Sequence, residues 1–192
     1  MKKVLKNLIS EGLSKNGYLS DELMELDKSI SPVFCVDVVL VPESKKPQAI
    51  LLYRDKTNFA SPNTYWIVGG RVPFGHSMID TLQTKIKKET GLSLKVKEED
   101  QLFSSDLIHI RKEDGNFYVV GSFLERTNQE DIYHTPATCY LVRTPPLKKI
   151  KDLIQPGNGN SKFKIIDKID SSLDPYIQKA VSAAWKKCGF DI

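Results

Sequence analysis

The sequence predicts an α/β fold, an α/β/α sandwich in which a mixed β-sheet lies between helices, with further helices at both chain ends. Three observations lead to this prediction. Two segments rich in β-branched and aliphatic residues open the central part of the chain, an amphipathic helix follows a pair of glycines, and several strand-like segments come after that helix. With 192 residues and 40% hydrophobic content, the chain can bury one good core.

The chain divides into a central domain, expected over residues 31–170, and two terminal additions. Residues 1–30 carry apolar residues at helical spacing, such as Val4 and Leu8, and are predicted to form a helical extension. This extension has three possible roles: it packs on the domain, covers a ligand cleft or forms a dimer contact. Residues 171–192 are predicted to form a helix that packs on the domain.

The central domain is predicted to begin with two strands. Val33–Val41 is rich in β-branched residues, and Ala49–Arg54 follows it after a polar loop. A further strand-like segment, Tyr65–Val68, leads into Gly69–Gly70.

A helix is predicted directly after this glycine pair. Ser77 is a candidate N-cap with Asp80 three residues on, and Gly91 is a candidate C-terminal stop after Thr90. Its apolar face is formed by Met78, Ile79, Leu82 and Ile86.

The rest of the chain reads as strands followed by helices. Strands are predicted at Leu92–Val96, Leu102–Ile110, Phe117–Glu125, Thr138–Val142 and Phe163–Ile166. Asp114–Gly115 is predicted to form a hairpin turn. A short helix is expected over Pro145–Ile154, and Asp174 and Pro175 are expected at the N-cap and first position of the last helix.

Composition limits the class of partner. The net charge of +4 suits an anionic ligand, and no stripe of basic residues interleaved with aromatics predicts a nucleic-acid partner. No apolar run approaches the ~20 residues of a membrane span, so we expect no membrane partner. Cys35, Cys139 and Cys188 are widely spaced and odd in number, which indicates free thiols in a reducing cytoplasm.

The segment Gly70–Leu92, GRVPFGHSMIDTLQTKIKKETGL, resembles a Nudix box, whose pattern is G-x5-E-x7-R-E-U-x-E-E-x-G-U with U a bulky aliphatic residue. Gly70 matches the first glycine, Glu89 the last acidic position, and Ile86 and Leu92 the aliphatic positions. The departures are His76 for the first glutamate, Thr84 for the arginine, and Lys85 and Lys88 for two further glutamates.

This resemblance covers about residues 33–167 and implies a Nudix hydrolase, an enzyme that splits a nucleoside diphosphate linked to another group. Such enzymes use Mg²⁺ or Mn²⁺ to neutralise and position the diphosphate. With Glu89 as its one remaining glutamate, the box helix is expected to hold a single ion.

Within the family, the chain is most similar to the GDP-mannose mannosyl hydrolase branch, which carries Y-W-F-V-P-G-G-R-V where this chain has Tyr65–Val72. By this resemblance, the metal ligands are Glu89 and the backbone carbonyl of Gly70. Arg71 is implied to clamp a phosphate as a catalytic residue beside Glu89, and Arg54 to lie near the leaving diphosphate, since an arginine fork can bind two phosphate oxygens.

Three other positions complete the predicted substrate site. Lys85 and Lys88 are candidates to replace the missing cations and bind phosphate directly. Asn160 aligns with the histidine that serves as general base in the mannosyl hydrolases, and an amide cannot accept a proton at neutral pH. His109 and His134 are alternative bases, but each is more typical of an ordinary solvated or hydrogen-bonded histidine.

Two functions therefore compete at this point. The first is a hydrolase that acts on a nucleotide-sugar with one divalent ion. The second is a catalytically degenerate Nudix domain that binds a nucleotide or nucleotide-sugar without hydrolysis. By resemblance, a homodimer is also expected.

Overall fold

The computed structural model describes residues 32–58, 61–111, 117–121 and 132–192. The predicted N-terminal extension over residues 1–30 and the predicted turn at Asp114–Gly115 lie outside these ranges.

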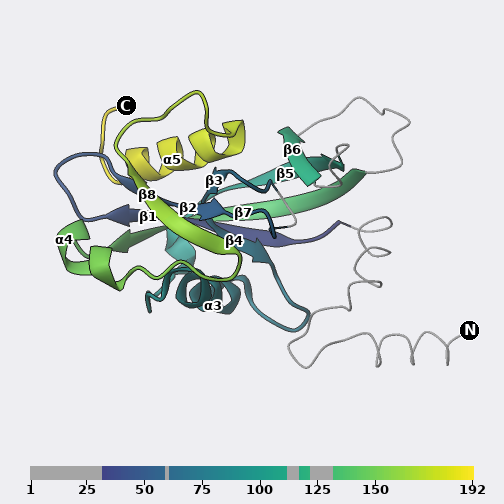
Figure 1. Cartoon of the computed structure of the whole chain (residues 1–192), viewed down its shortest axis with the longest axis horizontal. Helices are drawn as coiled ribbons and strands as arrows, with labels where there is room; N and C mark the ends of the chain where they lie inside the picture. Colours follow the sequence, from purple (N-terminus) through teal and green to yellow (C-terminus); the bar gives the residue numbers. More distant parts are fainter. Residues whose placement is uncertain (1–31, 59–60, 112–116, 122–131) are drawn as a thin grey trace, which may run out of the picture.

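The described residues form one mixed sheet of eight strands (Figure 1). In chain order these are β1 (Cys35–Pro42), β2 (Ala49–Arg54), β3 (Tyr65–Trp66), β4 (Val68–Arg71), β5 (Gln101–Arg111), β6 (Phe117–Gly121), β7 (Ile132–Thr144) and β8 (Asn160–Ile166). The spatial order is β3-β2-β1-β7-β5-β6, with β4 paired to β1 and β8 paired to β2. β1 and β7 run parallel, whereas β2 and β4 pair with β1 in the antiparallel direction.

Helices cover both faces of this sheet. Helix α3 (Met78–Thr90) lies on one face and α5 (Pro175–Lys187) on the other, while α4 (Leu147–Ile150) and the 3-10 turns η1 (Glu98–Asp100) and η2 (Lys151–Leu153) are short connections (Figure 1). The predicted α/β/α sandwich is confirmed. Within the described ranges, no helix combines the length and apolar character that crossing a membrane requires.

The alternation of side chains along β1 builds the two halves of the core. Val36 and Val38 are fully buried in the cluster that contains the α3 residues, whereas Val39 belongs to the cluster that contains the α5 residues. Asp37 lies between these strand positions, and it accepts a hydrogen bond from the hydroxyl group of Tyr176 in α5. The pleat of β1 therefore turns a carboxylate toward the α5 side of an otherwise apolar strand.

The predicted ends of α3 are confirmed. Ser77 Oγ accepts a hydrogen bond from the backbone N–H of Asp80 at 3.1 Å, and Gly91 ends the helix in a left-handed conformation with φ of 76°. The start of α5 is confirmed as well, with Asp174 as N-cap and Pro175 at the first helical position.

Substitution of Gly91 by alanine is expected to lower the free energy of unfolding by about 1 kcal/mol, because a Cβ atom is strained at positive φ. Urea denaturation would measure this loss. Lys87→Ala, an exposed change on the same helix, is the control and should shift the value by less than about 0.5 kcal/mol. An equal effect of both substitutions would show that the left-handed cap is not the cause.

The predicted strand at Leu92–Val96 is wrong, because this segment forms no strand between α3 and η1. Leu92 and Val96 are nevertheless buried in the core cluster beside α3. Leu92, Leu94 and Val96 recur at every second residue, as in a strand, but here the apolar side chains pack against the core although the segment forms no strand.

Other predicted segments differ in length. The helix predicted over Pro145–Ile154 is only the four residues of α4 followed by η2. β7 extends well beyond the predicted Thr138–Val142, because it pairs with β5 in one long antiparallel ladder, whereas β5 exceeds the predicted Leu102–Ile110 by only one residue at each end.

Candidate functional site

A cavity of about 500 Å³ is lined by residues of α3 and of six strands: β1, β2, β3, β4, β5 and β7, together with the first residue of β8. Its charged lining residues are Asp37, Arg54, Arg71, Lys85 and Glu89. The lining also includes polar and aromatic side chains, among them Asn58, Trp66, His109, Thr135, Asn158 and Asn160. A concave site that gathers charged groups from many elements is the expected place for a ligand.

Glu89 lies in the cavity wall near the C-terminus of α3 and is buried. Its Oε1 atom is 3.9 Å from Lys85 Nζ, and the Asn160 side-chain amide donates to its Oε2 atom at 3.4 Å. Burial raises the pKa of Glu89 to about 7, although Lys85 and Arg54 oppose this shift. Glu89 thus lies between a cation and an amide donor that contact its two oxygens.

Asp37 is a second buried carboxylate in the cavity wall, and the sequence motif gave no indication of it. Its Oδ2 atom accepts a hydrogen bond from Tyr176 at 2.8 Å. Burial raises the pKa of Asp37 to about 6, and the Tyr176 hydrogen bond, Arg54 and Lys85 lower it only in part. An acidic residue inside an apolar, β-branched strand is a signal that can be read from sequence, because a buried charge is costly unless it has a role.

Arg54 reaches the cavity from the end of β2. The register between β2 and β8 shifts between Tyr53 and Arg54, where Arg54 pairs with Asn160. The guanidinium carbon of Arg54 lies 4.6 Å from the centre of the Trp66 ring. The local shift in register brings the predicted Arg54 and Asn160 to one cavity, as irregular strand ends often do at functional sites.

The glycine pair in β4 allows close packing at the cavity floor. A Cβ atom on Gly69 would overlap the carboxylate of Asp37, so only glycine fits there. Gly70 has φ of 140°, and a Cβ atom on it would lie 3.0 Å from Lys85 Nζ. The Lys85 ammonium group therefore lies over Gly70 as well as near Glu89.

The two lysines of the box have different surroundings. Lys85 lines the cavity, whereas Lys88 is exposed and is not part of the cavity lining. Successive residues of a helix are about 100° apart around its axis. Viewed along the axis, Lys88 and Glu89 therefore lie on opposite sides of Lys85. The structure brings Arg54, Gly70, Arg71, Lys85, Glu89 and Asn160 to one cavity. Lys88 does not join them.

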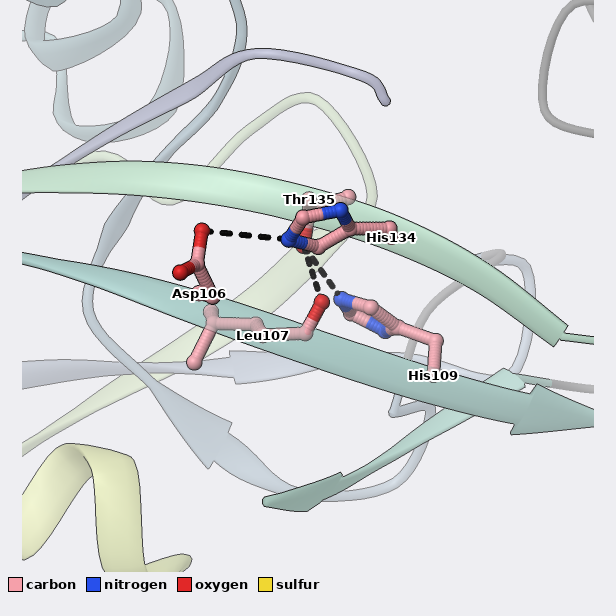
Figure 2. A network of polar contacts seen from close by, with 5 residues as sticks. All are labelled: Asp106, Leu107, His109, His134 and Thr135. Carbon is pink, nitrogen blue, oxygen red and sulfur yellow. Dashed lines mark hydrogen bonds and ion pairs between the residues drawn. The ribbon is translucent and has the colours of Figure 1, made fainter. Parts of the chain in front are cut away.

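The two candidate histidines also differ (Figure 2). His134 shares a hydrogen bond of 3.1 Å with Asp106 outside the cavity lining, whereas His109 lines the cavity and shares a hydrogen bond of 2.7 Å with Thr135 Oγ1. Burial, with smaller effects of Arg54 and His134, lowers the pKa of His109 to about 3. His109 is neutral at neutral pH, and such low basicity makes it a poor general base.

The lining residues do not fit the divalent ion that the resemblance implies. Within the described ranges, no three histidine, cysteine, aspartate or glutamate side chains are grouped so that they could hold a metal. Asp37 accepts a hydrogen bond from Tyr176, and the ammonium group of Lys85 lies 3.9 Å from the Glu89 carboxylate. Mg²⁺ requires oxygen ligands in a near-octahedral arrangement, which a neighbouring ammonium group disfavours.

Similarity to known proteins is visible in the fold but not in family models. No family model matches the chain, and no curated protein matches it. Among solved structures, an Ap4A hydrolase of C. elegans matches with 14% identity and a TM-score of 0.54, covering 82% of this chain and 99% of that chain. The Nudix domain of Shewanella oneidensis NrtR with ADP ribose matches with 14% identity and a TM-score of 0.52, covering 88% of this chain and 99% of that chain.

A third match is a bifunctional NMN adenylyltransferase/ADP ribose pyrophosphatase of Francisella tularensis, solved with AMP and a Mn ion. It has 9% identity and a TM-score of 0.50, and the match covers 88% of this chain and 45% of that chain. All three identities are too low to transfer an activity, but the matches show a shared architecture. The chain therefore has the Nudix fold.

Proposed function

We propose that the protein binds a nucleoside diphosphate derivative in the cavity, with a nucleotide-sugar as the first candidate ligand. The observation that carries this proposal is the convergence of Arg54, Arg71 and Lys85 on one cavity. A diphosphate group concentrates negative charge, and cationic side chains bind it through charge-assisted hydrogen bonds. Two carboxylates face these three cations, so the charged lining carries a formal excess of one positive charge.

The size and remaining lining of the cavity agree with such a ligand. Its volume of about 500 Å³ lies in the range of small-molecule sites. Asn158 and Asn160 offer amide groups for ribose or sugar hydroxyls, and Trp66 offers part of an aromatic wall. The solved structures with ADP ribose or AMP come from other proteins of this fold, and they support a nucleotide as the class of ligand.

A thermal-shift panel of nucleoside diphosphates and nucleotide-sugars tests the proposal, because a ligand that binds the folded state raises the midpoint of unfolding. We expect stabilisation by diphosphate ligands and none by the free sugars. Failure of every nucleotide to stabilise the protein would refute the proposal.

Arg54→Gln is expected to weaken ADP binding by about 10-fold or more, because it removes a charged donor of the cavity while keeping a polar side chain. Calorimetric titration with ADP measures the affinity. Arg143→Gln is the matched control, since Arg143 is exposed and outside the cavity lining. An equal affinity in the two variants would exclude Arg54 from the binding site.

Hydrolysis of the bound nucleotide-sugar is the second candidate function, and the observation in its favour is the position of Glu89. This carboxylate matches the last acidic residue of the box and lies in the cavity beside Gly70 and Arg71. Product analysis with a nucleotide-sugar panel and added Mg²⁺ or Mn²⁺ tests it, with Glu89→Gln as control. Nucleoside diphosphate plus free sugar, lost in the variant, would support attack at carbon as in the mannosyl hydrolases, with Glu89 and Arg71 as catalytic residues.

Two wider properties belong to the same proposal. We propose a cytoplasmic location, which agrees with the three free cysteines Cys35, Cys139 and Cys188. We also propose a homodimer, for which sedimentation analysis of the full chain is the test.

A further inference from the structure

Lys85 occupies the place where the Nudix pattern carries a carboxylate. It precedes Glu89 by four residues on α3, and both side chains turn toward the cavity with exposures of only 16% and 7%. A lysine with so little exposure keeps its ammonium group near the cavity wall rather than in open solvent. Its Nζ atom is 3.9 Å from Glu89 Oε1.

The same ammonium group also lies over the glycine loop, because a Cβ atom on Gly70 would be 3.0 Å from Lys85 Nζ. Lys85 Nζ is thus close both to the Glu89 carboxylate and to Gly70, the two residues that the family resemblance assigns to a metal ion. A divalent ion at this place would need oxygen ligands at about 2.0–2.6 Å. A positive ammonium group and a divalent cation repel each other at such separations.

Two further cationic side chains, Arg54 and Arg71, line the cavity together with Lys85. Asp37, also in the lining, accepts a hydrogen bond from Tyr176. A ligand that carries two phosphates therefore meets three positive side chains before any metal is added. Phosphate oxygens accept hydrogen bonds from such donors directly.

We propose that the Lys85 ammonium group takes the place of the divalent metal ion, so that the cavity binds a nucleoside diphosphate derivative without Mg²⁺. This inference rests on the proposed binding function and adds the way in which charge is neutralised. It also predicts that one substitution reverses the replacement: Lys85→Glu would put a second carboxylate next to Glu89, four residues apart on the same helix.

The test compares the wild type, Lys85→Glu and Lys88→Glu. Lys88→Glu makes the same change of charge on the same helix, but at an exposed position outside the cavity lining. Affinity for ADP is measured by calorimetry in EDTA and in excess MgCl₂. Affinity for Mn²⁺ alone is measured by electron paramagnetic resonance without any nucleotide.

We expect the wild type to bind ADP with the same affinity in EDTA and in MgCl₂, and to hold no Mn²⁺. The same result is expected for Lys88→Glu. Lys85→Glu should bind ADP about 10-fold or more weakly in EDTA, recover affinity in MgCl₂ and gain a Mn²⁺ site. Lys85→Gln, which removes the charge without adding a carboxylate, should lose ADP affinity and gain no Mn²⁺ site, and it keeps the test valid if Lys85→Glu does not fold.

Two results would overturn the inference: a wild-type protein that binds ADP only with Mg²⁺, or one that holds Mn²⁺ by itself with Lys85 in place. Absence of ADP and nucleotide-sugar binding by the wild type under all conditions would instead refute the proposed function. The Mn²⁺ measurements are independent of nucleotide, so the two failures are distinguishable.

Discussion

Relative to the wild type, the free energy of unfolding of the Asp37→Asn variant is expected to increase by about 3 kcal/mol as the pH rises from about 4 to 7. The pKa of Asp37 is raised from 3.8 to about 6 by burial, and one pKa unit corresponds to about 1.4 kcal/mol. The folded wild type therefore binds this proton more tightly than the unfolded chain. The resulting stability is fully present below pH 3.8 and is lost as the pH rises through about 6.

Asparagine has no proton to lose, and its amide oxygen can accept the same hydrogen bond from Tyr176. The free energy of unfolding of both proteins, measured by urea denaturation from pH 4 to pH 8, gives the difference curve. His109 acts in the opposite direction, because its lowered pKa means that stability is lost as the pH falls below 6.5. Subtraction of the wild-type curve removes this contribution.

Asp152→Asn is the matched control for this pH series, because it makes the same chemical change at an exposed position. Its difference curve should stay within about 0.5 kcal/mol. A flat curve for Asp37→Asn as well would mean that burial does not disfavour the Asp37 carboxylate, and the cavity would then be more open to solvent than its lining indicates.

The Trp185→Ala variant is expected to lower the free energy of unfolding by about 4 kcal/mol. Trp185 is 1% exposed in the core between α5 and the sheet, and its indole N–H donates to the carbonyl oxygen of Gln48 at 2.9 Å. Truncation removes a large apolar side chain, leaves a cavity and takes away this donor. Urea denaturation at neutral pH would measure the loss.

Lys186→Ala is the control for this substitution, because Lys186 is the exposed neighbour on the same helix. It should change the free energy of unfolding by less than about 0.5 kcal/mol. A loss below about 1 kcal/mol for Trp185→Ala would contradict the packing of α5, the helix that also brings Tyr176 to Asp37.

Features that depend on near neighbours in sequence were predictable. Ser77 and Gly91 mark the ends of α3 because capping is a local interaction, and the pattern around Gly70 and Glu89 identified the glycine loop and the box helix. The strand Ala49–Arg54 was predicted with its observed bounds, because an apolar run between polar loops has few alternatives.

Local patterns failed where a partner elsewhere in the chain decides the structure. Leu92–Val96 has the spacing of a strand, but none of the strands in the described part of the chain pairs with it, and its apolar residues pack beside α3 instead. The length of β7 follows from its pairing with β5, which no local propensity contains.

Local sequence patterns were enough to predict the Nudix-like order of elements and to align Glu89, Gly70 and Arg71 with the box. That Asp37 and His109 line the same cavity could be seen only in the folded chain, because residues on separate strands meet through long-range pairing. The folded chain also shows that Lys85 lines the cavity and Lys88 does not. Lys85 and Lys88 both lie close to Glu89 in sequence, but the direction in which α3 packs on the sheet turns Lys85 into the cavity and leaves Lys88 in solvent.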